Sequence, residues 1–350
     1  MKSFEKNIRK VEPYVPGEQP QKKVIKLNTN ENPYPPAPGV ERALKSMDMD
    51  RMRLYPDPTA GELVKALASY YHVDEDQVFV GVGSDDVLSM CFLTFFNSEK
   101  PIFFPDITYS FYKVWADLYR IPYECCPVDD NFRIVKEDYY RENGGVIFPN
   151  PNAPTGLYME LHDVEDIIAR NQDVIVIIDE AYIDFAGKSA LELIDKYENL
   201  IVVQTFSKAR SMAGMRIGYA ISNPLLIKYL NDAKYSFNSY TMNQAAIVAG
   251  VEAVKDRKYF EEGVRKIIKT REWAKKELER IGFSCLDSRA NFIFAAHPEY
   301  EARELFELLK SKGIYVRYWG SDRIEQYMRI TVGTKEEMEA LISLLEGRML

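Results

Sequence analysis

Two apolar stretches decide the fold: DVIVIIDEAY at residues 173–182 and LIVVQTFSK at residues 200–208. Each contains an unbroken apolar run, as a strand does when helices cover both faces of its sheet. Each run then ends abruptly in charged or polar side chains. Open α/β sheets bind their ligands beyond the carboxyl ends of the strands. The two stretches therefore predict an α/β sheet with a binding site at that edge.

Short apolar runs and helical patterns alternate over most of the chain. In the helical segments, apolar residues recur every three or four positions. Strands are expected at residues 78–83, 101–105, 123–128, 145–150, 173–179, 200–207 and 215–222. Helices are expected at residues 61–72, 84–96, 109–120, 163–170 and 242–282, followed by a strand–helix tail at 291–347. This order predicts a mostly parallel seven-stranded sheet flanked by helices, plus a smaller α+β domain.

The length of 350 residues exceeds what one hydrophobic core usually absorbs, so two domains are expected. The start of the chain is rich in Pro and Asn and is expected to be an extended arm with one short helix near residues 40–47. We assign residues 1–50 to this arm and part of the small domain, 51–250 to the large domain and 251–350 to the small domain.

Composition and charge exclude several classes of protein. The net charge of -8 argues against a nucleic-acid or anionic-membrane partner, which would require a basic face. Residues 1–10 contain no apolar run, so no signal peptide is expected, and no run of eighteen apolar residues suggests a membrane span. The four cysteines lack the spacing of a metal site or a disulfide framework. A cytoplasmic protein without a metal is expected.

Polar motifs follow four of the predicted strands. They are GVGSDD at residues 81–86, NPNAPTG at 150–156, DEAY at 179–182 and TFSK at 205–208. Taken alone, each has an ordinary alternative: a helix N-cap, a Pro/Asn/Gly turn, a capping carboxylate and a surface lysine. Their common position at strand ends makes one shared site the better interpretation.

Lys208 is the most informative residue in these motifs. A lysine that directly follows a buried strand is unusual, because lysine normally stays exposed. A buried amine that is close to other cations loses basicity and becomes a nucleophile toward carbonyl groups. Arg216, eight residues later, supplies a fixed positive charge that suits a phosphate group.

Together the motifs supply the groups that pyridoxal phosphate requires. Asp179 would keep the pyridine nitrogen protonated, so that the ring can act as an electron sink. Lys208 would bond covalently to the cofactor aldehyde, and Tyr182 would donate to the ring phenolate. Ser207 and Arg216 would hold the phosphate. The sequence therefore predicts pyridoxal 5'-phosphate as the cofactor, with Lys208, Asp179 and Tyr182 as the catalytic residues.

The chain resembles the histidinol-phosphate aminotransferase family of fold-type I enzymes over roughly residues 25–345. The motifs that carry the resemblance are LNTNENPY at 27–34, LYPDP at 54–58, GSDD at 83–86 and SFNSYT at 236–241. The resemblance implies a homodimer and further site residues. These are Gly83, Ser84 and Asp85 in the phosphate cup, Tyr109 on the pyridine ring, Tyr55 at the partner's cofactor phosphate, and Arg317, Arg329 and Asn30 at the substrate.

One position departs from the superfamily pattern. The residue before Pro-Thr-Gly is usually an asparagine that is hydrogen-bonded to the ring phenolate, but here it is Ala153. Asn152, one residue earlier, is a candidate for the same contact only if the turn adjusts. Tyr182 would still donate to that oxygen.

The function implied is transfer of an amino group between L-histidinol phosphate and 2-oxoglutarate in histidine biosynthesis. An aromatic amino-acid aminotransferase and a threonine-phosphate decarboxylase-like enzyme are alternatives on the same fold. A non-catalytic relative is a third, which the retained Lys208 and Asp179 argue against. A dehydrogenase is disfavoured, because the glycine motif is incomplete.

Overall fold

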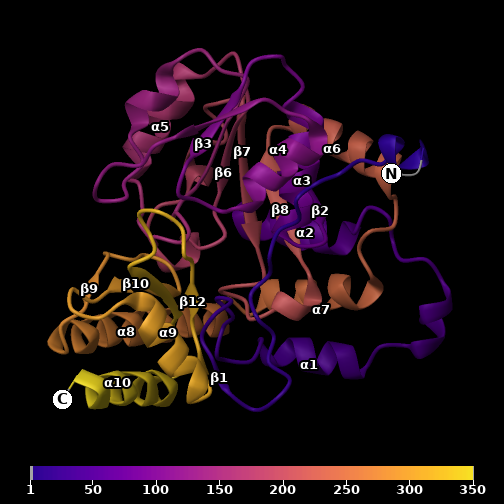
Figure 1. The fold of residues 1–350 in the computed structure, drawn as a ribbon. Coiled ribbons are helices and arrows are strands. Elements are labelled where there is room, and N and C mark those ends of the chain that lie inside the picture. The colour runs from indigo at the N-terminus through magenta and orange to yellow at the C-terminus, as the bar shows by residue number, and fades with distance from the viewer. Residues whose placement is uncertain (1–2, 350) are drawn as a thin grey trace.

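A computed structural model describes residues 3–349 of the chain and confirms the predicted α/β fold. The central sheet has the strand order β2-β8-β7-β6-β5-β3-β4 (Figure 1). Within this sheet only β8 runs antiparallel to its neighbours, so the sheet is mostly parallel. Its strands are β2 (Val78–Gly81), β3 (Ile102–Pro105), β4 (Tyr123–Cys126), β5 (Val146–Pro149), β6 (Val176–Asp179), β7 (Leu200–Thr205) and β8 (Gly218–Ser222).

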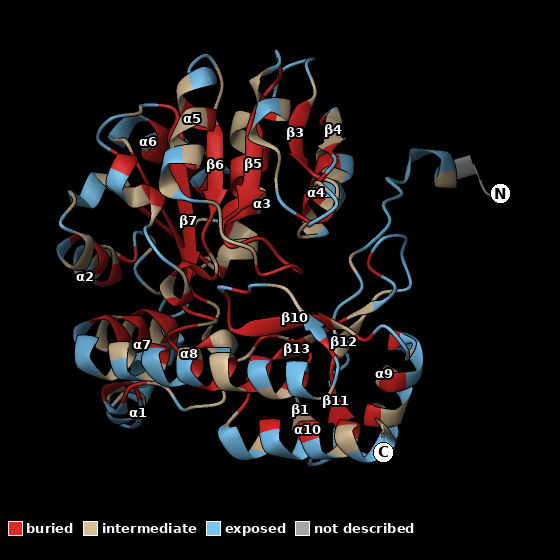
Figure 2. Cartoon of the chain, turned by 90° about the vertical axis from the view of Figure 1, so that its left-hand side faces the viewer, coloured by how far each residue is buried: buried red, intermediate tan, exposed pale blue. Residues whose placement is uncertain are grey.

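Helices cover both faces of this sheet, and consecutive strand residues enter two different cores. In β6, Val176 and Ile178 belong to one apolar cluster, whereas Ile177 belongs to the cluster on the other face. This is why the strand shows an unbroken apolar run. Figure 2 shows the strands as the most deeply buried layer. The helices around the sheet are α2 (Gly61–Tyr71), α3 (Ser84–Phe95), α4 (Phe111–Tyr119), α5 (Leu161–Arg170), α6 (Pro224–Phe237) and α7 (Gln244–Lys255).

The C-terminal third builds a second, smaller sheet with its own apolar core. Its four strands are antiparallel in the order β12-β13-β10-β9. They are β9 (Ser284–Cys285), β10 (Phe292–Ala296), β12 (Arg317–Tyr318) and β13 (Tyr327–Thr331), and they pack with α8 (Arg257–Arg280), α9 (Ala302–Ser311) and α10 (Lys335–Met349). No helix within residues 3–349 is long and apolar enough to cross a membrane.

The N-terminal arm joins this smaller sheet region. Strand β1 (Ile25–Lys26) pairs in parallel with β11 (Ile314–Tyr315), and helix α1 (Pro38–Lys45) packs on α7. The domain boundaries at residues 50 and 250 stay a prediction. Single turns of 3-10 helix occur at Ser3–Asn7, Met49–Arg53, Glu75–Gln77, Lys136–Tyr140, Ile183–Phe185, Ala190–Leu193 and Ala213–Met215.

Two features of the helices differ from the sequence prediction. The stretch 242–282 is not one helix, because the chain breaks between α7 and α8 at Asp256, whose carboxylate accepts from the backbone N–H of Tyr259. Helix α6 was not among the predicted elements. Its start did carry a signal, since Asn223 caps the helix and Pro224 occupies the first position.

The start of β8 lies against the loop that opens α3, and we predict that this contact tolerates only glycine. A Cβ atom on Gly218 would lie 2.3 Å from the carbonyl carbon of Gly83 and 2.3 Å from the nitrogen of Ser84. Backbone atoms cannot rotate away, and overpacking of this kind costs about 1–3 kcal/mol. Gly218→Ala should lower the free energy of unfolding by about that amount in urea denaturation. Gly214→Ala is the matched control, because its Cβ would meet nothing within 4 Å. Equal stability of the two variants would contradict the close approach.

Candidate active site

A cavity of about 450 Å³ lies between the carboxyl ends of the central strands and the smaller sheet. Three parts of the chain line it: the strand ends and the loops after them, the N-terminal segment 14–31, and the two small strands β12 and β13. Most of the predicted site residues line this cavity. They are Asn30, Ser84, Asp85, Tyr109, Asp179, Tyr182, Ser207, Lys208, Arg216, Arg317 and Arg329.

Lys208 presents its amine to this cavity from the loop after β7. The loop is held because Phe206 is completely buried in the core. Lys208 Nζ donates a hydrogen bond to the carbonyl oxygen of Thr29 at 3.2 Å and lies 5.7 Å from the centre of the Tyr182 ring. The side chain is half-buried. An amine with one weak acceptor in a cavity wall is well placed to react with a carbonyl group.

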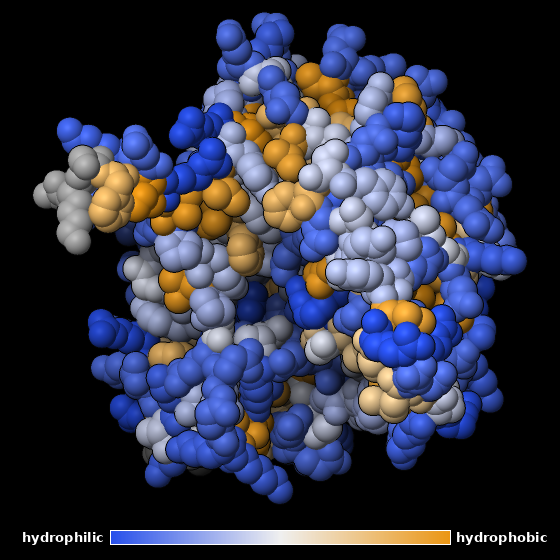
Figure 3. All heavy atoms as spheres, turned by 90° about the vertical axis from the view of Figure 1, so that its right-hand side faces the viewer, coloured by the Kyte–Doolittle hydropathy of each residue, from blue (hydrophilic) through white to orange (hydrophobic). Residues whose placement is uncertain are grey.

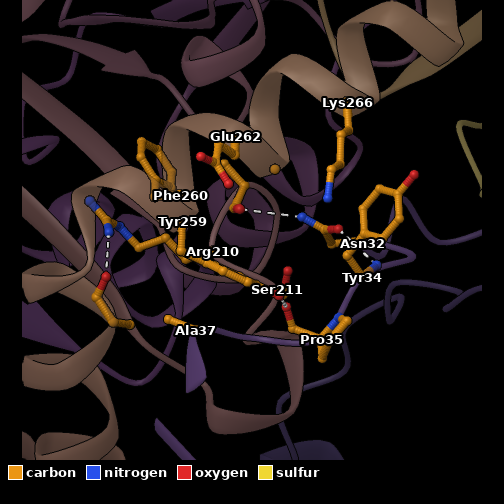
Figure 4. Close-up of a pocket in the computed structure, with 13 residues that line it drawn as sticks. Asn32, Tyr34, Pro35, Ala37, Arg210, Ser211, Tyr259, Phe260, Glu262 and Lys266 are labelled. Atoms are coloured by element: carbon orange, nitrogen blue, oxygen red, sulfur yellow. Dashed lines mark hydrogen bonds between the residues drawn. The ribbon is translucent and has the colours of Figure 1, made fainter. Parts of the chain in front are cut away.

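A second, much smaller cavity of about 60 Å³ lies behind the same loop (Figure 4). Asn32 lines it and donates through Nδ2 to the carbonyl oxygens of Lys208 and Ala209, at 3.0 and 3.2 Å. In Figure 4, Lys266 of α8 points toward Asn32 and Tyr34, and Glu262 comes from the same helix. The volume suffices for only a few water molecules. This region therefore anchors the Lys208 loop and is too small to bind a substrate.

Asp179 ends strand β6 and is 4% exposed. The hydroxyl of Tyr112 donates to its Oδ2 at 2.8 Å, and the backbone N–H of Ala181 donates to its Oδ1 at 3.2 Å. Burial raises the pKa of this carboxyl from 3.8 to about 6, against the opposing effect of the two donors. A cationic partner, such as a protonated pyridine nitrogen, would stabilise the charged form of this buried carboxyl.

The loop between β2 and α3 forms one end of the cavity. Gly83 has a φ of +86° and does not itself line the cavity, but a Cβ on it would lie 2.4 Å from Nη2 of Arg216. The positive φ favours glycine here, and a Cβ would displace the Arg216 guanidinium from this turn. Arg216 Nη2 lies 3.2 Å from Oδ2 of Asp85, and Ser84 begins helix α3.

This end of the cavity fits a phosphate group. Arg216, the hydroxyls of Ser84 and Ser207, and the first N–H groups of α3 are all donors that line or border the same space. A helix N-terminus with hydroxyl and guanidinium donors is a favourable anion site. The phosphate cup, the buried Asp179 and the free amine of Lys208 together fit pyridoxal phosphate.

The aromatic side chain of Tyr109 and two arginines also line the cavity. The hydroxyl of Tyr109 donates to Oδ1 of Asp85 at 2.7 Å, and burial raises the pKa of Tyr109 well above its ordinary value. Arg329 donates to the carbonyl oxygen of Asn28 at 3.0 Å. Arg317 donates to the carbonyl oxygens of Val15 and Pro16, at 3.0 and 3.3 Å.

Arg329 has no carboxylate partner among the described residues. Its Nε is buried and makes no hydrogen bond within residues 3–349. Burial lowers the pKa of this guanidinium. The Cζ atom of Arg329 lies 5.1 Å from the centre of the Trp319 ring and 5.3 Å from the centre of the Phe292 ring. A half-buried, incompletely paired cation that lines a cavity favours an anionic ligand.

Asn152 lies outside the cavity, contrary to the prediction. It is 1% exposed; Thr108 Oγ1 donates to its Oδ1 at 3.0 Å, and its Nδ2 donates to the carbonyl oxygen of Ile107 at 2.9 Å. The next residue, Ala153, lines the cavity instead. A contact from Asn152 to a cofactor would break both buried hydrogen bonds, so the turn holds this amide in place.

Two further predicted residues have unexpected surroundings. Asn30 lines the cavity, but its side-chain amide is already bonded to Tyr182 and Thr331. Tyr55 does not line the cavity; it is 81% exposed and stacks on Tyr240 with ring centroids 4.6 Å apart. Tyr55 therefore cannot be assigned to the site of its own chain.

Two residues of the site were not predicted from the sequence: Tyr112, which lies behind the wall, and Tyr14, which lines it. Tyr112 was not identified as the hydrogen-bond partner of Asp179, although it follows Tyr109 by one helical turn. Tyr14 was also missed; it lines the cavity and stacks on Phe111 with ring centroids 4.2 Å apart. The arm around Tyr14 has no periodic pattern, so only its packing reveals its place.

Comparison with known proteins identifies the family. The sequence profile of the family Aminotransferase class I and II matches residues 22–345. A histidinol-phosphate aminotransferase of Clostridium botulinum is 50% identical over 348 residues, which cover 99% of this chain and 98% of that relative. The chain belongs to the histidinol-phosphate aminotransferase family. It is therefore an enzyme that depends on pyridoxal phosphate.

Solved structures agree with this family. The histidinol-phosphate aminotransferase of Sinorhizobium meliloti, in complex with pyridoxal-5'-phosphate, has a TM-score of 0.85 at 25% identity, covering 94% of this chain and 92% of that one. The L-threonine-O-3-phosphate decarboxylase of Porphyromonas gingivalis has a TM-score of 0.80 at 21% identity, covering 93% of this chain and 99% of that one. The second likeness concerns the fold alone.

The raised pKa of Asp179 predicts a trade between stability and function. In the cofactor-free protein, a carboxyl whose pKa rises from 3.8 to about 6 on folding destabilises the fold above pH 6, where it is charged in both states. This penalty disappears as the pH falls toward 4. At about 1.4 kcal/mol per pKa unit, its upper bound is about 3 kcal/mol. Asp179→Asn should therefore raise the free energy of unfolding of the cofactor-free protein at pH 8, with a smaller gain at pH 5.

The same variant should lose nearly all turnover and retain cofactor less well. Asp184→Asn is the control, because burial raises the pKa of Asp184 to about 6 as well, but this residue does not line the cavity. It should keep its turnover. Near wild-type turnover in Asp179→Asn would show that Asp179 is only a structural cap.

Proposed function

We propose that this enzyme transfers an amino group between L-histidinol phosphate and 2-oxoglutarate, giving imidazole-acetol phosphate and L-glutamate in histidine biosynthesis. The observation that carries the proposal is Arg329, a half-buried arginine whose buried Nε is unbonded, in the same cavity as Lys208. Relatives about 50% identical over nearly the whole chain bear the name of this activity.

We assign the following roles to the residues of this chain. Bound pyridoxal phosphate supplies an electron sink for the bonds at the reacting carbon. Lys208 holds the cofactor and carries a proton to and from that carbon. Asp179 keeps a proton on the pyridine nitrogen, and Tyr182 donates to the phenolate oxygen. The remaining cofactor contacts are those of Ser84, Ser207 and Arg216 with the phosphate, Asp85 with Arg216, and Tyr109 with the ring.

The substrates of the two half-reactions differ in charge. Histidinol phosphate carries a phosphate and no carboxylate, whereas glutamate carries two carboxylates. Arg317 and Arg329 line one cavity and present guanidinium groups, which bind either anion in a bidentate way. One pair of arginines thus serves both substrates.

An aromatic amino-acid aminotransferase is the second candidate. The rings of Tyr14, Tyr109 and Phe111 lie together at the wall of the cavity, with Tyr14 stacked on Phe111. Such a wall suits any flat ring, whether imidazole or phenyl. The two activities differ in the anion that must be bound, so direct competition between donors separates them.

The test is single-turnover bleaching of the bound cofactor's visible band with histidinol phosphate, glutamate, phenylalanine and threonine phosphate in parallel. Histidinol phosphate should have the highest specificity constant among the donors other than glutamate. Arg329→Ala should weaken both half-reactions by roughly ten- to a hundred-fold, because a charge-assisted contact is worth about 1.5–3 kcal/mol. Arg323→Ala is the control, since this arginine pairs with Asp106 outside the cavity.

A higher specificity constant for phenylalanine would make the enzyme an aromatic aminotransferase. Release of carbon dioxide from threonine phosphate would make it a decarboxylase. If borohydride reduction of the yellow enzyme labels a lysine other than Lys208, the assignment of the whole site fails.

We also propose a homodimer in which Tyr55 of each chain reaches the cofactor phosphate of its partner. Tyr55 belongs to a group of exposed apolar side chains on one face, which includes Met49, Met52, Leu54 and Tyr240. Figure 3 shows orange apolar side chains among hydrophilic ones on the face that carries this segment. Exposed patches of this kind mark protein interfaces.

All four cysteines are unpaired, which supports the expected cytoplasmic location.

Hybrid dimers test the role of Tyr55. A Lys208→Ala chain and a Tyr55→Phe chain should complement each other, because one of the two sites in their hybrid carries neither lesion. Activity should rise above that of either homodimer after the subunits are mixed. Tyr229→Phe, another exposed tyrosine, should behave like wild type in the same assay. No recovery in verified hybrids would show that Tyr55 does not act in the site of the partner subunit.

A further inference from the structure

The segment Asn28–Asn32 crosses the active site between β1 and α1 and contacts three of its functional residues. The carbonyl oxygen of Thr29 accepts from Lys208 Nζ, and that of Asn28 accepts from Arg329. The third contact is made by a side chain: Asn30 Nδ2 donates to the hydroxyl oxygen of Tyr182 at 2.9 Å. Asn30 is 1% exposed and has a φ of +56°, a conformation that asparagine tolerates better than most residues.

Thr331 determines which way the Asn30 amide points. The backbone N–H of Asn30 donates to Oγ1 of Thr331 at 3.0 Å, and a backbone N–H can only donate. The Thr331 hydroxyl therefore accepts this bond, and its own hydrogen is directed at Oδ1 of Asn30, 3.1 Å away. An amide nitrogen could not accept it. With the Thr331 hydrogen on Oδ1, the Nδ2 group faces Tyr182.

This arrangement determines the direction of the hydrogen bond at Tyr182. The tyrosine oxygen accepts from Asn30, so the tyrosine proton is not used in that contact. No other residue in the described range 3–349 forms a hydrogen bond with this hydroxyl. The proton is therefore left to donate into the cavity that Tyr182 lines.

We propose that Asn30 is a positioning residue that makes Tyr182 the hydrogen-bond donor to the phenolate oxygen of the cofactor. The inference rests on the proposed cofactor contacts. Asn30 is needed because Ala153, which lines the same cavity and packs in the same apolar cluster as Tyr182, provides no polar side chain there. The two side-chain amides of that turn, Asn150 and Asn152, are both bonded elsewhere.

The surroundings of Tyr182 support this role. The edge of the Phe292 ring packs on the tyrosine ring, with centroids 5.1 Å apart, and fixes its plane. The charged groups that share the cavity with Tyr182 are Glu31, Asp85, Asp179, Lys208, Arg216, Arg317 and Arg329. None of them is bonded to its hydroxyl. Asn30 alone therefore controls the orientation of that proton.

The competing explanation is that Asn30 only anchors the arm. Asn291 Nδ2 donates to the carbonyl oxygen of Asn30 at 3.0 Å, and Asn291 is as deeply buried. Asn291→Ala weakens the same anchor without touching Tyr182, so it is the matched control.

The experiment follows the visible absorption of the bound cofactor in the holoenzyme as a function of pH. A hydrogen bond donated to the phenolate stabilises its negative charge, so its loss makes the bound cofactor keep its proton to higher pH. In Asn30→Asp the new carboxylate can only accept, and it should draw the Tyr182 proton toward itself. The midpoint of the absorption change should move up by about one pH unit, a tenfold change in the proton equilibrium. Tyr182→Phe should cause a similar shift.

The double variant Asn30→Asp/Tyr182→Phe distinguishes an effect transmitted through the Tyr182 hydroxyl from a direct effect of the new carboxylate charge. If Asn30 acts through Tyr182, Asn30→Asp should add little to the shift that Tyr182→Phe already causes. A carboxylate that acts only through its charge would add its full effect in that background, and this result would overturn the proposal. Thr331→Val, which is neutral and of similar shape, frees the amide to turn and should give a smaller upward shift.

Asn291→Ala should lower the thermal stability and leave the midpoint in place. An equal shift in Asn291→Ala, or an unchanged midpoint in both Asn30→Asp and Thr331→Val, would reduce Asn30 to an anchor. The proposed function is tested separately by the wild-type spectrum, the borohydride label on Lys208 and the comparison of donors. It therefore stands even if Asn30 proves not to act through Tyr182.

Discussion

The burial of Asp179 is the constraint on which the rest of the site depends. Its strand must be apolar on both sides to fill the two cores of the sheet, yet it ends in a carboxyl that is 4% exposed. Two donors, Tyr112 and the N–H of Ala181, are not sufficient to offset the loss of water, so the pKa of the carboxyl rises to about 6. A cationic ligand relieves this penalty, and the site is therefore built to receive one.

The cations of the cavity are held by backbone carbonyl oxygens more than by carboxylates. Lys208, Arg317 and Arg329 donate to carbonyl oxygens of the N-terminal arm, and only Arg216 has a carboxylate partner there, Asp85. Carbonyl oxygens orient these groups without neutralising their charge. The positive charge is thus left for a phosphate or carboxylate ligand, which explains how an acidic chain with a net charge of -8 can bind anions.

The arm has a second role as the connection between the two sheets. Its strand β1 pairs with β11 beside the smaller sheet, and the following residues contact the loop of Lys208 and the hydroxyl of Tyr182. The cavity is closed by residues that lie hundreds of positions apart in the chain, such as Asn30 and Thr331. Movement of the smaller sheet relative to the large one would therefore act directly on the catalytic groups through this arm.

The sequence by itself predicted the sheet, the cofactor and the strand-end part of the cavity wall, because these depend on local patterns: continuous apolar strands, and polar motifs that directly follow them. The signature residues Asp179 and Lys208 were identified in this way. The positions of Tyr109, Asn30, Arg317 and Arg329 were predicted from the resemblance to a known family. Tertiary structure alone decided the contacts of Asn152, Tyr112 and Tyr14, since hydrogen-bond partners distant in sequence leave no periodic signal. It also decided the orientation of the Asn30 amide, because only packing against Thr331 selects which of its two polar atoms faces Tyr182.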